Sequence, residues 1–165
     1  MDGPSERERL DEIFRACYGR LVITGYALTG NITEAQDVVA EAFMRGVAHR
    51  STLLAADSPE AWLRTVLRNV VRRRWRRSRQ LVALLRQSAA GAPVAEPELS
   101  PDRVAVMAAI GRLPAAQRDT VALFYIADLP VNEIAATLGV PVGTVKARLS
   151  RARAALSLDL KDTVS

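Results

Sequence analysis

The stretch EIAATLGVPVGTVKARLSRAR, residues 133–153, has the spacing of two helices joined by a tight turn. Apolar residues recur three and four positions apart on both sides of Gly139 and Pro141. Gly139 can adopt the left-handed backbone of a helix end, and Pro141 can open the next helix because its missing N–H would have no partner there. This spacing predicts a helix-turn-helix.

The two sides of the second helix differ in chemistry. Its buried side is expected at Val145 and Leu149, which would pack against Ile134, Ala135 and Leu138 of the first helix. Positions expected to face outward are Thr144, Lys146, Ala147, Ser150 and Arg151. A helix N-terminus offers N–H groups to phosphate, and Lys or Arg can reach guanine edges in the major groove. The pattern therefore predicts a DNA-binding helix, the alternative being an ordinary helical hairpin with solvated charges.

A second basic helix is predicted upstream. The run WLRTVLRNVVRRRWRRSR, residues 62–79, contains eight arginines and no acidic residue, with Trp62 and Trp75 among them. Like charges three and four residues apart repel one another on a helix, so such a run is unfavourable without a polyanionic partner. Ser58-Pro59 supplies its N-cap and first helical position.

An acidic helix face is predicted between these features and the N-terminus. Glu34, Asp37 and Glu41 lie three and four residues apart, opposite an apolar face at Ala35, Val38, Val39, Ala42 and Phe43. Thr33 and Gln36 are spaced as a capping box for this helix. On composition alone the acidic face would be solvated; the alternative is a docking surface.

The remaining segments define the domain organisation. Residues 8–28 and 115–127 have helical periodicity, with Phe124 and Tyr125 expected in the core, whereas about 49–57 is expected to be irregular. Residues 86–100 lose periodicity and gather Gly and Pro, which is typical of a flexible linker. The sequence predicts an all-α protein of two small helical domains, residues 1–85 and 101–160.

Composition narrows the class of protein. The 165 residues are 49% hydrophobic and 25% charged, with a formal net charge of +5, which fits a globular chain with a polyanionic partner. One cysteine and one histidine exclude an intrachain disulfide and the usual zinc sites, and no cofactor is expected. The N-terminus is charged and no apolar run reaches membrane-spanning length, so we expect a cytoplasmic protein.

Several strings resemble one family. LPAAQRDTVALFYIADLPVNEIAATLGVPVGTVKARLSRARAAL at 113–156 resembles region four of bacterial RNA polymerase sigma factors of the extracytoplasmic-function type. LTGN at 28–31, AQDVVAEAF at 35–43 and WLRTVLRN at 62–69 resemble their region two. The resemblance covers both domains in the family's order, without the long middle region of larger sigma factors.

The resemblance implies roles for the surfaces. The acidic face, through Asp37 and Glu41 with Glu34, would dock on the clamp helices of the largest subunit of core RNA polymerase. Residues implied for the −10 promoter element are Leu53, Trp62, Arg64, Arg68, Asn69, Arg72 and Arg73, with Asn69 facing a flipped-out base. Residues implied for the −35 element are Thr144, Lys146, Ala147, Ser150 and Arg151. The family also implies an anti-sigma protein as regulator.

The sequence departs from the family pattern in two places. Gln36 and Ala40 stand where Glu and Gln are common, which would weaken polymerase binding. The helix before the turn opens with Pro130-Val131-Asn132 where Ser or Thr is usual, and a poorer cap costs about 1 kcal/mol.

Three other classes of protein explain less of the sequence. A stand-alone helix-turn-helix regulator would bind paired half-sites as a dimer, and it leaves the 62–79 run unexplained. A membrane-surface adaptor using the arginines on anionic lipid leaves the helix-turn-helix unexplained. An enzyme would need a phosphate-cradling glycine loop or a nucleophile–base pair, and the sequence shows neither.

Overall fold

The computed structural model describes residues 3–85 and 101–164, and within them the regular structure is helical throughout. The helices are α1 (Glu6–Thr29), α2 (Ile32–Ala48), α3 (Arg50–Ala55), α4 (Pro59–Leu85), α5 (Pro101–Arg112), α6 (Ala115–Val121), the π-helix η1 (Ala122–Ile126), α7 (Val131–Leu138) and α8 (Val142–Val164). The all-α prediction is confirmed. The expected linker at 86–100 lies outside the described residues.

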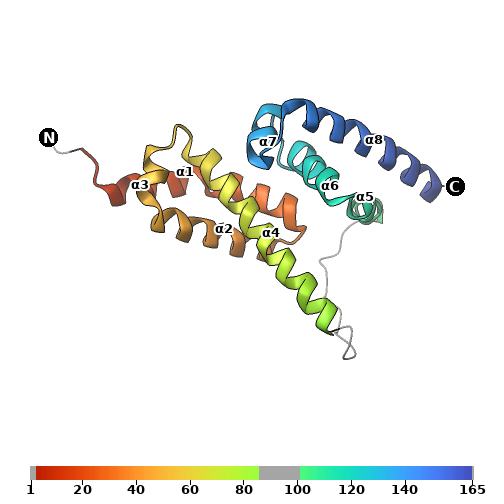
Figure 1. The fold of residues 1–165 in the computed structure, drawn as a ribbon, viewed down its shortest axis with the longest axis horizontal. Coiled ribbons are helices and arrows are strands. Elements are labelled where there is room, and N and C mark those ends of the chain that lie inside the picture. The colour runs from red at the N-terminus through yellow and green to blue at the C-terminus, as the bar shows by residue number, and fades with distance from the viewer. Residues whose placement is uncertain (1–2, 86–100, 165) are drawn as a thin grey trace.

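The first domain is built from α1 to α4. Figure 1 shows α4 crossing α1 and α2 obliquely, with the short α3 at one end, and the three longer helices contact one another. Their shared core includes Leu21, Val38, Leu63 and Leu67, all fully buried. Gly25 permits the close approach of α1 to α2, since a Cβ there would lie 3.3 Å from Ala35.

The start of α2 differs from the predicted capping box. Gly30 ends α1 with a φ of 71°, and the chain turns at once, so α2 begins at Ile32. The N-cap is therefore Asn31, whose Oδ1 accepts the backbone N–H of Glu34 at 3.0 Å, and Thr33 already lies in the first turn. The cap predicted for α4 is confirmed, because Ser58 Oγ accepts the backbone N–H of Ala61 at 3.2 Å.

The segment expected to be irregular, about 49–57, contains a helix instead. Arg50–Ala55 form α3, which has no side-chain cap at its N-terminus. Leu53 anchors it in the core beside Gly46, where an added Cβ would lie 3.1 Å from a Leu53 methyl group. Tertiary burial of one leucine, which local periodicity does not reveal, holds this short helix.

The second domain contains α5 to α8. Residues 115–127, predicted as one continuous helix, differ from that prediction. The α-helix ends at Val121 and continues as the wider π-helix η1 to Ile126. Leu123 is fully buried, but Tyr125 is 54% exposed, so its expected core position is wrong. The changed winding turns Tyr125 outward, where its Oη accepts a hydrogen bond from Arg153 Nε at 2.7 Å.

The helix-turn-helix formed by α7 and α8 is confirmed. Ile134, Leu138, Val145 and Leu149 are buried between its helices. Gly139 has a φ of 66° and donates its N–H to the carbonyl of Ala135. Pro130 supplies no side-chain cap to α7, as the sequence led us to expect.

Replacing Gly139 with alanine should lower the free energy of unfolding by about 1 kcal/mol, because a side chain at positive φ is strained. The matched control is Gly143→Ala: Gly143 has an ordinary helical backbone and open space around its Cβ position, so alanine should be neutral or stabilising. Urea unfolding of both variants measures the difference. Equal losses in the two variants would contradict a role for the backbone conformation of Gly139.

The two domains pack against each other. Helix α7 and η1 of the second domain contact α4 and α1 of the first, as Figure 1 shows for α7 and α4. None of the described helices is both long and apolar enough to cross a bilayer.

Candidate nucleic-acid interface

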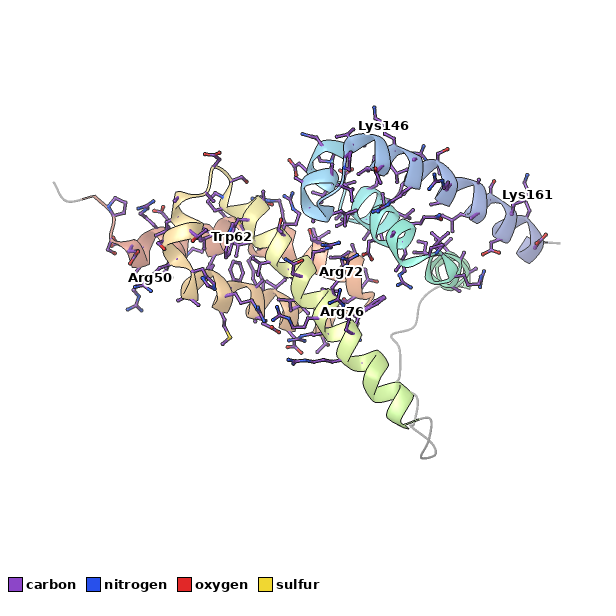
Figure 2. All side chains as sticks on the ribbon, in the orientation of Figure 1. Arg50, Trp62, Arg72, Arg76, Lys146 and Lys161 are labelled. Carbon is purple, nitrogen blue, oxygen red and sulfur yellow. The ribbon has the colours of Figure 1, made fainter. Side chains whose placement is uncertain are left out.

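The outward side of α8 is accessible. Lys146, Ser150 and Arg151 are exposed, and Thr144 and Ala147 are half-buried. They lie opposite Val145 and Leu149, which fix the helix to its own domain. Figure 2 shows Lys146 projecting away from the rest of the molecule. A basic helix face supported from behind by a helix-turn-helix core is able to enter a major groove.

A shallow hollow lies beside α4 on the first domain. Trp62 and Asn69 line it together with Ala61, Thr65, Val66 and the loop residues 56–58. Asn69 is exposed, and Arg73, one turn further along, is exposed too. The structure therefore brings together an indole, an amide and a guanidinium, groups that can contact an unstacked base and its phosphate.

Another side of α4 faces the second domain. Arg64 Nη1 donates to Glu133 Oε2 at 2.9 Å, and Arg64 Nη2 lies 3.6 Å from Glu60 Oε1. Glu60 is held in turn by two hydrogen bonds of 2.8 Å from Arg20. With a side chain only 7% exposed, Arg64 is unavailable to a phosphate while the domains are packed in this arrangement.

Leu53 is misplaced by the prediction. It has no exposed surface and lies in the core of the first domain. The residue that anchors α3 cannot at the same time face a nucleotide, so Leu53 is removed from the candidate interface.

The remaining arginines near the domain boundary are partly covered. Arg68 is half-buried, and burial lowers its pKa, with the neighbouring Arg72 adding to the effect. Arg72 is exposed but lines a cavity between the domains. Trp75 is half-buried and packs under Arg118, whose guanidinium carbon lies 4.5 Å from the centre of the ring. The predicted −10 set is thus divided between an open side and a covered side of α4.

The three carboxylates on the acidic face of α2 differ in exposure and in their partners. Asp37 is exposed, and Glu34 is half-buried in the first turn. Glu41 accepts hydrogen bonds from Arg45 at 2.9 Å and from Arg74 at 2.9 Å. Burial alone would raise the pKa of Glu41, but these arginines outweigh it and hold the pKa below its usual range. Asp37 is therefore the most available carboxylate of this face.

Sequence reasoning missed Met44 as part of the same surface. It lies seven residues after Asp37 on α2 and is 73% exposed. A large exposed apolar side chain beside a carboxylate is typical of a protein-docking surface. An outward-facing methionine on an otherwise amphipathic helix was the available signal. Among the described residues, no group of three His, Cys, Asp or Glu side chains could hold a metal ion.

Two helical domains, one with a helix-turn-helix and the other with a basic helix beside a shallow hollow, define a DNA-binding protein with two recognition surfaces. Family models match both: Sigma-70 region 2 over residues 13–80 and Sigma-70, region 4 over residues 103–156. Curated relatives point to the same family. The ECF RNA polymerase sigma factor SigL of Mycobacterium tuberculosis is 34% identical over 159 residues, which cover 91% of this chain and 90% of that protein.

Two further relatives give the same family. The ECF RNA polymerase sigma factor EcfG of Rhodopseudomonas palustris is 32% identical, covering 79% of this chain and 74% of EcfG, and SigW of Bacillus subtilis is 30% identical, covering 92% and 84%. The chain belongs to the ECF sigma factors of RNA polymerase. Sigma factors direct promoter-specific initiation of transcription.

Solved structures share the fold. The sigma factor RpoE in complex with the anti-sigma factor NepR from Bartonella quintana superposes with a TM-score of 0.72 at 25% identity, covering 92% of this chain and 96% of that one. CnrH, solved in complex with the cytosolic domain of CnrY, has a TM-score of 0.64 at 24% identity, covering 98% and 92%.

Proposed function

We propose that this chain binds core RNA polymerase through α2, reads the −35 element with α8 and binds the −10 element with the open side of α4. The observation that carries the proposal is the accessible basic face of α8, mounted on a helix-turn-helix in the same chain as the Trp62–Asn69 hollow. The protein itself performs no covalent chemistry. It acts in the cytoplasm, where the polymerase supplies catalysis and the sigma factor supplies the choice of site.

The −35 element is the partner proposed for α8. Base contacts from Lys146, Ala147, Ser150 and Arg151 select the sequence, and Thr144 at the start of the helix contacts phosphate. Contacts to phosphates release counterions, so the affinity should fall steeply as salt rises.

Replacing Lys146 or Arg151 with alanine should cost about 1–3 kcal/mol at the preferred −35 duplex, and less at a scrambled duplex, so that sequence preference is relaxed. Lys161→Ala, about four turns beyond Lys146 on the same helix, removes the same kind of charge at a distance from these residues and is the control. Fluorescence anisotropy with both duplexes, over a range of salt concentrations, measures the effect. Equal losses for both duplexes would assign the two side chains to phosphate alone.

The −10 element is the partner proposed for the open side of α4. A base that leaves the stack would enter the hollow near Asn69 and Trp62, and Arg73 would hold the adjoining phosphate. Such binding offsets an unstacking cost of a few kcal/mol and so favours strand opening. Arg68 and Arg72 would join the phosphate contacts once the second domain moves away from α4.

Asn69→Ala should weaken binding of single-stranded −10 DNA about tenfold and leave binding of −35 duplex unchanged, because an amide that reads a base edge contributes about 1–3 kcal/mol. Asn132→Ala, an exposed asparagine on α7, serves as the control. Anisotropy with an oligonucleotide that carries the non-template strand tests both variants. Unchanged affinity for the single strand would remove Asn69 from the interface.

An anti-sigma protein is the regulator we propose, since RpoE and CnrH, which share the fold, were solved with NepR and CnrY. Promoter-dependent transcription from a DNA library, by bacterial core RNA polymerase with and without this protein, tests the function. Protein-dependent starts that share two spaced upstream elements would support it. Selection of one duplex site by the protein alone, with the polymerase silent and unbound, would instead indicate a stand-alone regulator.

A further inference from the structure

A cavity of about 220 Å³ lies at the boundary of the two domains, between α1, α4 and α6. Arg68, Arg72 and Arg76 line it from α4, and Arg118 and Asp119 line it from α6. Figure 2 shows Arg72 and Arg76 one turn apart along α4, on the stretch that passes the second domain. The family's two recognition surfaces do not require such a cavity.

The charge of the cavity is unbalanced. Four arginines and a single carboxylate line it, and Asp119 forms no ion pair with any described arginine. Burial raises the pKa of Asp119, although Arg118 and the arginines of α4 oppose the shift, which further weakens its power to neutralise them. The cavity is therefore strongly electropositive in a partly desolvated setting, where charge–charge interactions are strengthened.

Two of the arginines that line the cavity have a covered Nε–H group without an acceptor among the described residues. Arg68 Nε and Arg118 Nε are buried and have no hydrogen-bond partner. Because each Nε is itself covered, a ligand in the cavity would bind the outer guanidinium nitrogens, and one held by both arginines would bridge α4 and α6.

We propose that this cavity is a binding site for a small, multiply charged oxyanion of about the size of a diphosphate. Guanidinium groups bind phosphate oxygens in pairs, and diphosphate oxygens are numerous enough to reach Arg68 and Arg118 together. Leu28 and Val71 form an apolar part of the wall, and the small volume excludes ligands of drug size. Lysines in place of the arginines would lack this forked geometry.

The consequence for DNA rests on the proposed function. Arg68 and Arg72 are among the residues proposed to hold −10 phosphates, so an oxyanion on them competes with DNA. Because the ligand bridges α4 and α6, it also stabilises the closed packing of the domains by mass action. The site thus provides a way for a small metabolite anion to restrain the free sigma factor.

The test is isothermal titration calorimetry of the full chain with inorganic pyrophosphate in magnesium-free buffer at constant ionic strength. We expect saturable binding of one pyrophosphate per chain, weakened at least tenfold by Arg118→Gln and unchanged by the control Arg153→Gln, which removes an equal charge at Tyr125. Asp119→Asn should tighten binding several-fold, because it removes the one repelling carboxylate. Circular dichroism confirms that each variant is folded.

Two results would overturn the site: no saturable binding by the wild-type chain, or equal weakening by Arg118→Gln and Arg153→Gln, which would indicate diffuse attraction to the basic surface. Asp119→Asn keeps the test decisive if Arg118→Gln fails to fold, since a defect in folding does not tighten an affinity. In a second measurement, pyrophosphate should weaken binding of single-stranded −10 DNA to the wild-type chain, and not to Arg118→Gln. If the chain bound pyrophosphate but no promoter DNA, the site would stand and the proposed function would fail.

Discussion

Replacing Asp37 with lysine should weaken binding of this chain to core RNA polymerase about a hundredfold or more. Asp37 is the exposed carboxylate of α2, with no ion pair among the described residues, whereas Glu41 is already occupied by Arg45 and Arg74. A reversed charge within a complementary interface costs several kcal/mol, because an attractive pair becomes a repulsive one. Microscale thermophoresis with labelled core enzyme measures the affinity directly.

Three variants separate docking from general charge effects. Glu12→Lys makes the same charge change at an exposed position of α1 and should leave polymerase affinity nearly unchanged. Met44→Ala should weaken binding by a smaller factor than Asp37→Lys, since it removes apolar area from the same face. Binding of −35 duplex must survive in all three. If Asp37→Lys retained full affinity for the polymerase, the assignment of this face of α2 to docking would be wrong.

Two departures from the family's sequence pattern lie on this same face of α2. Gln36 and Ala40 are both exposed on α2 and stand where the family commonly has a carboxylate and an amide. With Glu41 engaged by arginines, the face depends more heavily on Asp37 and Met44 than the family pattern would suggest. Sequence periodicity could predict that these side chains share one face of α2, because such a prediction needs only their spacing along one helix.

The helix-turn-helix and the cores of both domains could be predicted for the same reason. Their determinants are local: apolar spacing, Gly139 at a left-handed turn, and Ser58 before Pro59. Leu53 and Arg64 could not be placed in this way. Whether Leu53 faces DNA or the core depends on how α3 lies against Gly46, and the burial of Arg64 depends on Glu133, which lies 69 residues further along the chain.

The π-helical winding of η1 could not be predicted from the sequence either. A π-helical turn inserts within a helical pattern without changing its composition, so Tyr125 keeps the spacing of a core residue and still points outward. The covered side of α4 could not be predicted either. Only the packing of the domains shows which arginines of the 62–79 run are covered by the second domain.

Glu133→Lys should open the two domains and increase the affinity of the free protein for single-stranded −10 DNA about tenfold or more. Arg64, with a side chain 7% exposed, donates to Glu133 across the domain boundary at 2.9 Å, and this contact covers one side of α4. Lysine at position 133 would place a second cation beside a largely buried guanidinium. Without Glu133, Arg64 keeps only the longer contact with Glu60 at 3.6 Å, and the added repulsion brings the cost to about 2–4 kcal/mol.

The opening can be measured separately from its effect on DNA. Spin labels on Ser51→Cys in α3 and Ser157→Cys in α8 are both on exposed positions of different domains, while the native Cys17 is buried. Double electron–electron resonance should show a longer and broader distance distribution in Glu133→Lys than in the parent. Glu133→Gln should give an intermediate result, because it removes the ion pair without adding repulsion.

The matched control for this effect is Asn132→Lys, which adds a positive charge to the neighbouring exposed residue of α7 and leaves the Arg64–Glu133 contact in place. If added charge alone attracted DNA, Asn132→Lys and Glu133→Lys would tighten binding alike while the label distance stayed constant. If the contact restrains the domains, only Glu133→Lys lengthens the distance, and its gain in affinity appears with −10 single strands and not with −35 duplex, because α8 is already accessible. A longer distance without any gain for −10 DNA would mean that the covered arginines of α4 take no part in promoter binding.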